Sequence, residues 1–189
     1  MGYGDFAKSY LGFALGWLAH PTLWLLGGPF RWLSLLIATE QQESGLNPGA
    51  FNPERTGSAG LLQFQTTTWN QVAPSTWAKA TSAFTTSDPR RDPGKQGYVG
   101  AAYIAYAVGA DYRWLLIALP IIGPIYLRAL WRYGVGGFTA GRGVFGLLSE
   151  EWAYTSANEM RFLQWFYGSR IITIIPLIVA LMTRRKRGM

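Results

Sequence analysis

The sequence predicts a mainly α-helical protein whose polar central domain lies between two apolar ends. Strand-like alternation of apolar and polar residues is weak throughout the 189 residues, and no heptad pattern is sustained. Long apolar runs occur near both termini, whereas polar and turn-forming residues gather between 40 and 100. We therefore expect an all-α domain with long loops, flanked by hydrophobic N-terminal and C-terminal membrane segments.

Composition excludes several functional classes. The chain has no cysteine and a single histidine, His20, which excludes disulfide frameworks, thiolate metal sites and cysteine nucleophiles and argues against a histidine-based triad. Apolar residues make up 49% and charged residues 14%, a composition too apolar for disorder. The net charge of +7 includes the basic run 184–187, so the basic character is mainly a terminal feature. We expect no nucleic-acid partner.

The first hydrophobic segment covers residues 1–30. No side chain from Ser9 to Phe30 is charged, and this stretch exceeds the length of about 20 residues that a membrane-spanning helix needs. His20 and Pro21 interrupt it, although membrane helices tolerate proline better than soluble ones. A membrane segment is the first interpretation. An interfacial apolar arm and a buried core helix remain alternatives.

The last segment, 162–189, contains a second apolar run. Residues 171–183 are apolar and lead directly into Arg-Arg-Lys-Arg at 184–187, a pattern that marks the cytoplasmic end of a membrane helix. A core helix with a solvated basic tail is the alternative. A third run, 114–127, is interrupted by prolines and predicts either a buried helix or a hairpin at the membrane interface.

A helix over 31–43 places a carboxyl group at its end. Ser44 and Gly45 are expected to end this helix, with Gly45 as the C-cap. Glu40 and Glu43 then lie on one side of the helix. The negative end of the helix dipole and partial burial both favour the protonated form of Glu43, the form that a general acid requires.

Three blocks follow one another along the chain. The first reads ESGLNPGAFN (43–52) and, after a short insertion at 53–56, GSAGLLQF (57–64); the second reads DPGKQGYVGAAYI (92–104) and the third ALWRYGVG (129–136). In this order they resemble the lytic transglycosylase (SLT-type) family, which has the lysozyme-like fold. Leu62 takes the place of the family's usual Met, and Gln96 that of its Asn. Two departures matter most: Gly134 replaces a second Asn, and the gap between 100 and 133 is wider than the family usually shows.

The resemblance implies a lysozyme-like domain over 31–140, with the apolar run as an insertion and 141–161 as a connecting segment. It implies cleavage of peptidoglycan by one carboxylate, Glu43, without metal or cofactor. Gln63 and Tyr133 are carried over as substrate-binding groups that line the site near Glu43. Ser44 is carried over as their neighbour at the helix end, where it would hydrogen-bond either the substrate or a local carbonyl.

Other residues near these blocks have more ordinary interpretations. Glu40 and Glu54 are expected to be structural, and Asp92 to cap the helix that follows it. Trp69 and Trp77 are expected either to stack on sugar rings or to pack in the core.

The hydrophobic ends together with this resemblance predict a membrane-anchored enzyme of a bacteriophage or another envelope-crossing assembly. Its partners would be peptidoglycan strands, a lipid membrane and other proteins of that assembly. The catalytic domain would face the periplasm, with the basic C-terminus on the opposite side of a virion or inner membrane. A hydrolytic lysozyme of the same fold, and a structural membrane protein with a decayed domain, remain alternatives.

Overall fold

The computed structural model describes residues 3–54, 57–110, 131 and 134. Its elements, with η for 3-10 helices, are α1 (Tyr3–Ala19), η1 (Pro21–Leu26), η2 (Pro29–Trp32), α2 (Leu33–Ser44), β1 (Phe51–Asn52), β2 (Ser58–Ala59), α3 (Thr66–Val72), η3 (Pro89–Arg91) and α4 (Pro93–Ala110). The prediction of a mainly helical protein is confirmed for this part of the chain. The segments expected at 114–127, 141–161 and 162–189 lie outside the described residues.

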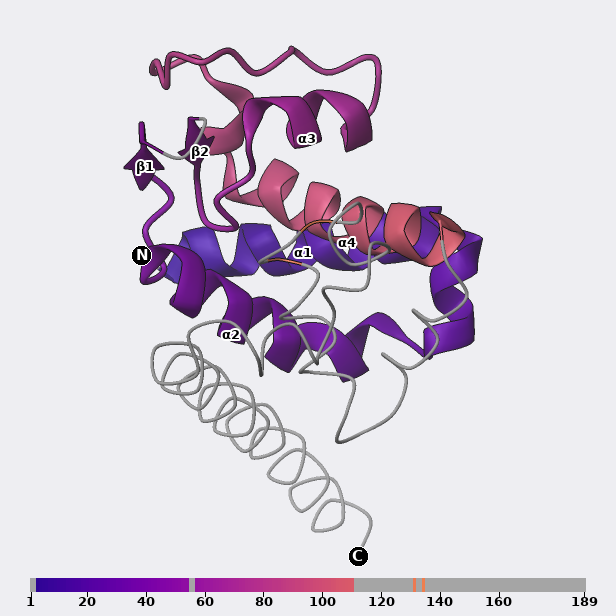
Figure 1. Ribbon diagram of the computed structural model, residues 1–189. Helices are drawn as coiled ribbons and strands as arrows, with labels where there is room; N and C mark the ends of the chain where they lie inside the picture. The colour runs from indigo at the N-terminus through magenta and orange to yellow at the C-terminus, as the bar shows by residue number, and fades with distance from the viewer. Residues whose placement is uncertain (1–2, 55–56, 111–130, 132–133, 135–189) are drawn as a thin grey trace, which may run out of the picture.

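Helices α1 and α4 lie side by side at the centre of the fold, with α2 on one side and α3 on the other (Figure 1). Glycines allow this contact. A Cβ atom on Gly12 would overlap the carbonyl oxygen of Gly94, and one on Gly97 would overlap that of Ser9. Because glycine has no Cβ, the two backbones touch directly at these points.

Large apolar side chains from α1, η1, α2, α3, α4 and the loop before α3 share one core. Its fully buried members include Phe13, Trp17, Leu23, Leu26, Leu62, Trp69, Val99 and Ile104. Two indole N–H groups hold η1 in place: that of Trp17 donates to the carbonyl of Gly27 at 2.8 Å, and that of Trp32 to Leu26 at 2.9 Å. The N-terminal segment is therefore part of the packed domain.

The uncharged stretch 9–30 is not one continuous helix in the structure. Helix α1 ends at Ala19, and Pro21 begins η1, where a proline that lacks the amide hydrogen is tolerated in a first turn. One face of α1 buries Phe13 and Trp17, as the core-helix alternative predicts. Among the described residues, no helix combines the length and the apolarity needed to cross a bilayer.

A small hairpin was missed by the sequence prediction. β1 pairs antiparallel with β2, so that Phe51 lies opposite Ala59 and Asn52 opposite Ser58. Two-residue strands are too short to show an alternating pattern. The hairpin stands over the C-terminal end of α2 (Figure 1), and Glu43 belongs to the last turn of that helix.

Candidate active site

Glu43 lies in the last turn of α2, where the sequence places it. Gly45 caps the helix in the left-handed conformation with φ of 62°, as predicted. Its N–H donates to the carbonyl of Gln41, and the N–H of Leu46 donates to that of Glu40. These bonds satisfy carbonyls that the helix end leaves open. The turn that carries Glu43 is thus firmly closed.

Ser44 directs its hydroxyl back into the helix. The Oγ atom donates to the carbonyl of Glu40 at 2.9 Å. A helical serine often bonds in this way to the carbonyl four residues earlier. Of the two roles that the sequence left open for Ser44, contact with substrate or with a local carbonyl, the structure contains the second.

The two glutamates of α2 lie in different surroundings. Glu40 is fully buried and accepts a hydrogen bond from the hydroxyl of Ser9 on α1. Burial raises the pKa of Glu40 to about 7, against the opposing effect of the Ser9 bond. Glu43 is only partly buried. Glu43 is therefore the carboxyl group of α2 that a substrate can reach, and the structural interpretation of Glu40 agrees with its burial.

Gln63 joins the two motif segments that follow α2. Its Nε2 atom donates to the carbonyl of Ala50 at 3.2 Å and to that of Gly60 at 2.8 Å. The amide N–H of Gly60 donates to Ala50 as well, at 2.9 Å. The side chain is partly exposed, and its donor group is occupied by the backbone, so the oxygen is the atom left to meet a ligand.

The backbone of Gln63 is strained. Its φ of 50° lies in the left-handed region, which costs a non-glycine residue about 1–2 kcal/mol. Such a conformation persists only where the surroundings hold it in place. The loop 57–64 that carries Gln63 is therefore held by groups outside it.

Gln96 on α4 is one of those groups. It is fully buried, and its Oε1 accepts from the N–H of Leu62 at 3.2 Å while Nε2 donates to the carbonyls of Ala59 and Arg90. Gly60 has φ of 79°, and a Cβ there would overlap the Gln96 amide. A side-chain amide is retained where the resemblance expects Asn, and it fixes the loop.

The block at 129–136 reaches the same region. The ring of Trp131 packs 5.4 Å from that of Tyr103 and 6.4 Å from that of Phe64, measured between centroids, and Phe64 directly follows Gln63. Gly134 has φ of 68°, a conformation that Asn adopts more readily than other non-glycine residues. Glycine therefore suits the position where the family has Asn. Tyr133 lies outside the described residues.

The remaining candidates are mostly structural. Asp92 caps α4, since its Oδ1 accepts from the N–H groups of Gly94 and Lys95, as predicted. Trp69 is fully buried, which rules out stacking on a sugar ring. Trp77 packs against the core with its ring 5.2 Å from that of Tyr98.

Two features were missed by sequence reasoning. Arg90 and Asp88 form a buried ion pair of 2.8 Å, although their run of charges resembles a solvated loop. Phe51 is 39% exposed and stacks on Phe84 at 5.4 Å between ring centroids, and it directly follows Ala50, whose carbonyl accepts the bond from Gln63. Among the described residues, no group of acidic or histidine side chains is arranged to hold a metal ion.

The central part of the chain matches a known protein family. Residues 30–118 match the model of the family described as Transglycosylase SLT domain. This stretch includes Glu43, Ser44 and Gln63 and ends before Tyr133. Neither a curated protein nor a solved structure matches the chain. The mostly helical architecture with this domain fits the all-α lysozyme-like fold, and the match supports a transglycosylase-type enzyme acting on peptidoglycan.

Proposed function

We propose that the protein is a lytic transglycosylase that cleaves the β-1,4 bond between N-acetylmuramic acid and N-acetylglucosamine. The observation that carries the proposal is the placement of Glu43. It is the partly exposed carboxyl group at the capped end of α2, next to the segment that Gln63 fastens, and it lies within the residues that match the SLT domain.

In this mechanism Glu43 acts first as an acid and then as a base. It protonates the glycosidic oxygen, and the bond from that oxygen to C1 of the muramic acid breaks. The substrate's own N-acetyl group stabilises the developing cation. The C6 hydroxyl then attacks C1 while the Glu43 carboxylate takes its proton, which closes a 1,6-anhydro ring. No water is consumed, and general acid–base help of this kind is worth roughly 10²–10⁴ in rate.

Three of the other carboxyl groups that the structure describes are engaged in structural contacts, which supports a mechanism with one carboxylate. Ordinary glycosidases need two carboxyl groups flanking the bond. Here Glu40 is buried, Asp88 is paired with Arg90, and Asp92 caps α4. Each of these carboxyl groups already has a structural task.

Glu43→Gln tests the proposal directly. The variant keeps the size of the side chain but loses the proton-transferring group, so release of 1,6-anhydro products from purified peptidoglycan should fall at least about 100-fold. Glu54→Gln, at an exposed position, is the matched control and should retain activity.

Mass spectrometry of the products separates the lytic transglycosylase from its alternatives, because a hydrolytic lysozyme adds water and leaves a reducing sugar. Equal activity of the wild type and Glu43→Gln would refute the assignment of Glu43. A well-folded wild type that releases no products would favour a structural protein with a decayed domain.

Membrane association is the second part of the proposal. Leu11, Leu15 and Leu18 recur along the face of α1 that points away from α4, and each is between 52 and 60% exposed. Trp24 and Leu25 in η1 are 60 and 74% exposed. No charged residue occurs between Ser9 and Phe30. Leucine and tryptophan on an uncharged face are typical of contact with the lipid interface. The apolar run before 184–187 supports the same conclusion.

The absence of cysteine makes this testable at single positions. Leu15→Cys, labelled with an environment-sensitive dye, should shift to shorter emission wavelength when vesicles of phosphatidylethanolamine and phosphatidylglycerol are added to the full chain. Ser87→Cys, in an exposed polar loop, is the control and should not shift. An unchanged Leu15 signal in a sample that floats with the vesicles would show that α1 does not touch lipid.

The biological setting that we propose follows from both parts. A membrane-associated enzyme that opens peptidoglycan locally suits a bacteriophage or another assembly that crosses the cell envelope. The catalytic domain would lie in the periplasm and the residues 184–187 across the virion or inner membrane. The partners would be glycan strands, lipid and other proteins of the assembly.

A further inference from the structure

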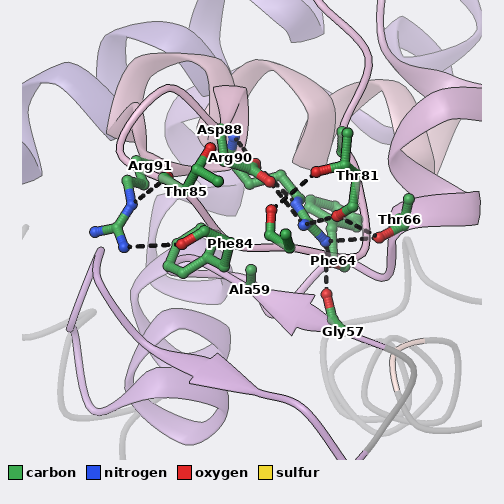
Figure 2. Close-up of polar contacts among 12 residues, drawn as sticks. Gly57, Ala59, Phe64, Thr66, Thr81, Phe84, Thr85, Asp88, Arg90 and Arg91 are labelled. Atoms are coloured by element: carbon green, nitrogen blue, oxygen red, sulfur yellow. Dashed lines mark hydrogen bonds and ion pairs between the residues drawn. The ribbon is translucent and has the colours of Figure 1, made fainter.

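The loop 57–64 is tied at both ends to one buried side chain. The Nη1 atom of Arg90 donates to the carbonyl of Gly57 at 2.6 Å and to that of Phe64 at 3.1 Å. Gly57 begins the loop that carries Gln63, and Phe64 ends it. Figure 2 shows the guanidinium group of Arg90 between these two carbonyls.

The same guanidinium also reaches two segments outside the loop. Nη1 contacts the hydroxyl of Thr66 at 3.3 Å, in the first turn of α3, and Nη2 donates to the carbonyl of Thr81 at 2.8 Å. One group thus joins the loop, α3 and the chain that leads to η3 (Figure 2). None of these segments is close to Arg90 in the sequence except the last.

Asp88 orients the guanidinium. Its Oδ1 accepts from Nε of Arg90 at 3.0 Å and its Oδ2 from Nη2 at 2.8 Å. The two side chains are 0 and 1% exposed. A guanidinium has five N–H donors in a planar fork, and these contacts occupy all of them. Asp88 thereby neutralises a buried charge and fixes the plane of the fork.

From these contacts we infer that Arg90 is a positioning residue that acts through Gln63, by closing the loop 57–64 so that the Gln63 oxygen meets the substrate. The inference rests on the proposed function. Gln96 holds the middle of the loop, at Ala59 and Leu62, and Arg90 holds its two ends. The left-handed backbone of Gln63 requires both constraints.

A double-mutant cycle with the full chain separates positioning from general stability. Arg90→Lys keeps the charge but has three donors on a flexible stem and cannot reproduce the fork. We expect kcat/KM for peptidoglycan fragments to fall about 10-fold in the wild-type background, the size expected for a lost bond to a charged group. In a Gln63→Ala background the same change should reduce it less than about 2-fold. An equal factor in both backgrounds would overturn the inference.

Two further variants keep the test decisive. Asp88→Asn keeps the shape of the side chain and removes the charge that orients Arg90, so it serves if Arg90→Lys fails to fold. Its effect on kcat/KM should likewise be large in the wild-type background and small in the Gln63→Ala background. Arg91→Lys is the matched control, because Arg91 bonds to the carbonyls of Thr85 and Phe84 and not to the loop. Its effect should be equal in both backgrounds. A wild type that is active and depends on Glu43 but shows no coupling would refute the inference alone, whereas activity independent of Glu43 would refute the proposed function.

Discussion

The buried carboxyl group of Glu40 makes stability depend on pH in a defined direction. Its pKa is raised from 4.5 to about 7, chiefly by burial, while the hydrogen bond from Ser9 acts in the opposite direction. Below about pH 4.5 the group is protonated in both the folded and the unfolded chain. As the pH rises toward 7, the unfolded chain releases the proton and the folded chain retains it, so the free energy of unfolding falls.

The magnitude follows from the difference between these values. A shift of one pKa unit corresponds to about 1.4 kcal/mol, so the shift of Glu40 corresponds to about 3 kcal/mol. Glu40→Gln cannot ionise and lacks this contribution. The free energy of unfolding of the wild type, relative to that of Glu40→Gln, should therefore fall by about 3 kcal/mol between pH 4 and pH 8.

Urea unfolding of both proteins, followed by tryptophan fluorescence at several pH values, measures this difference. Any effect of the Gln side chain on packing is the same at each pH and leaves the trend unchanged. The matched pair of wild type and Glu54→Gln, which alters an exposed glutamate, should give a nearly constant difference. A difference for Glu40→Gln that stays flat, or that rises with pH, would refute the reasoning.

Three other substitutions give direct tests of the site. Gly60→Ala should lower the free energy of unfolding by about 3 kcal/mol or more, because the new Cβ would overlap Gln96 and the Arg90 carbonyl. Urea denaturation measures this change, and Gly28→Ala, where a Cβ would meet open space, is the control. Gly134→Asn should be tolerated, since φ is 68° and the nearest atom, the Tyr103 hydroxyl, would lie at 3.7 Å; a loss of more than about 1 kcal/mol would show that the position requires glycine. Phe51→Ala should raise KM for glycan strands several-fold with little change in kcat. The Phe51 ring is partly exposed and follows Ala50, which bonds to Gln63, and stacking on sugar there would stabilise the ground state and the transition state alike. Steady-state kinetics would detect this change.

Local signals in the sequence predicted what depends on local structure. Gly45 and Asp92 mark the end of α2 and the start of α4, because capping is decided within a few residues. The resemblance carried Gln63 over as a group of the substrate site near Glu43, and the structure joins its side chain to Ala50, in the segment that follows Glu43.

Long-range packing could not be predicted in the same way. Arg90 lies in a run of charges that is typical of a surface loop, and only the carbonyls brought to it from Gly57, Phe64 and Thr81 make burial favourable. The N-terminal run indicated a membrane segment because it carries no charge. The glycines that press α1 against α4 were the available signal of a packed helix.

The folded unit extends beyond the residues that match the known family, because helix α1 is part of the core. This helix lies outside the matched stretch 30–118, yet it contributes Phe13 and Trp17 to the core and the Ser9 hydroxyl to Glu40. A fragment that begins at residue 30 would expose the side of α4 that packs against α1, and the Glu40 carboxyl would lose the hydrogen bond from Ser9. A minimal folded unit cut from this chain must therefore begin before α1. Loss of activity on trimming the N-terminus to residue 30 would reflect an open core, because Glu43 and Gln63 would still be present.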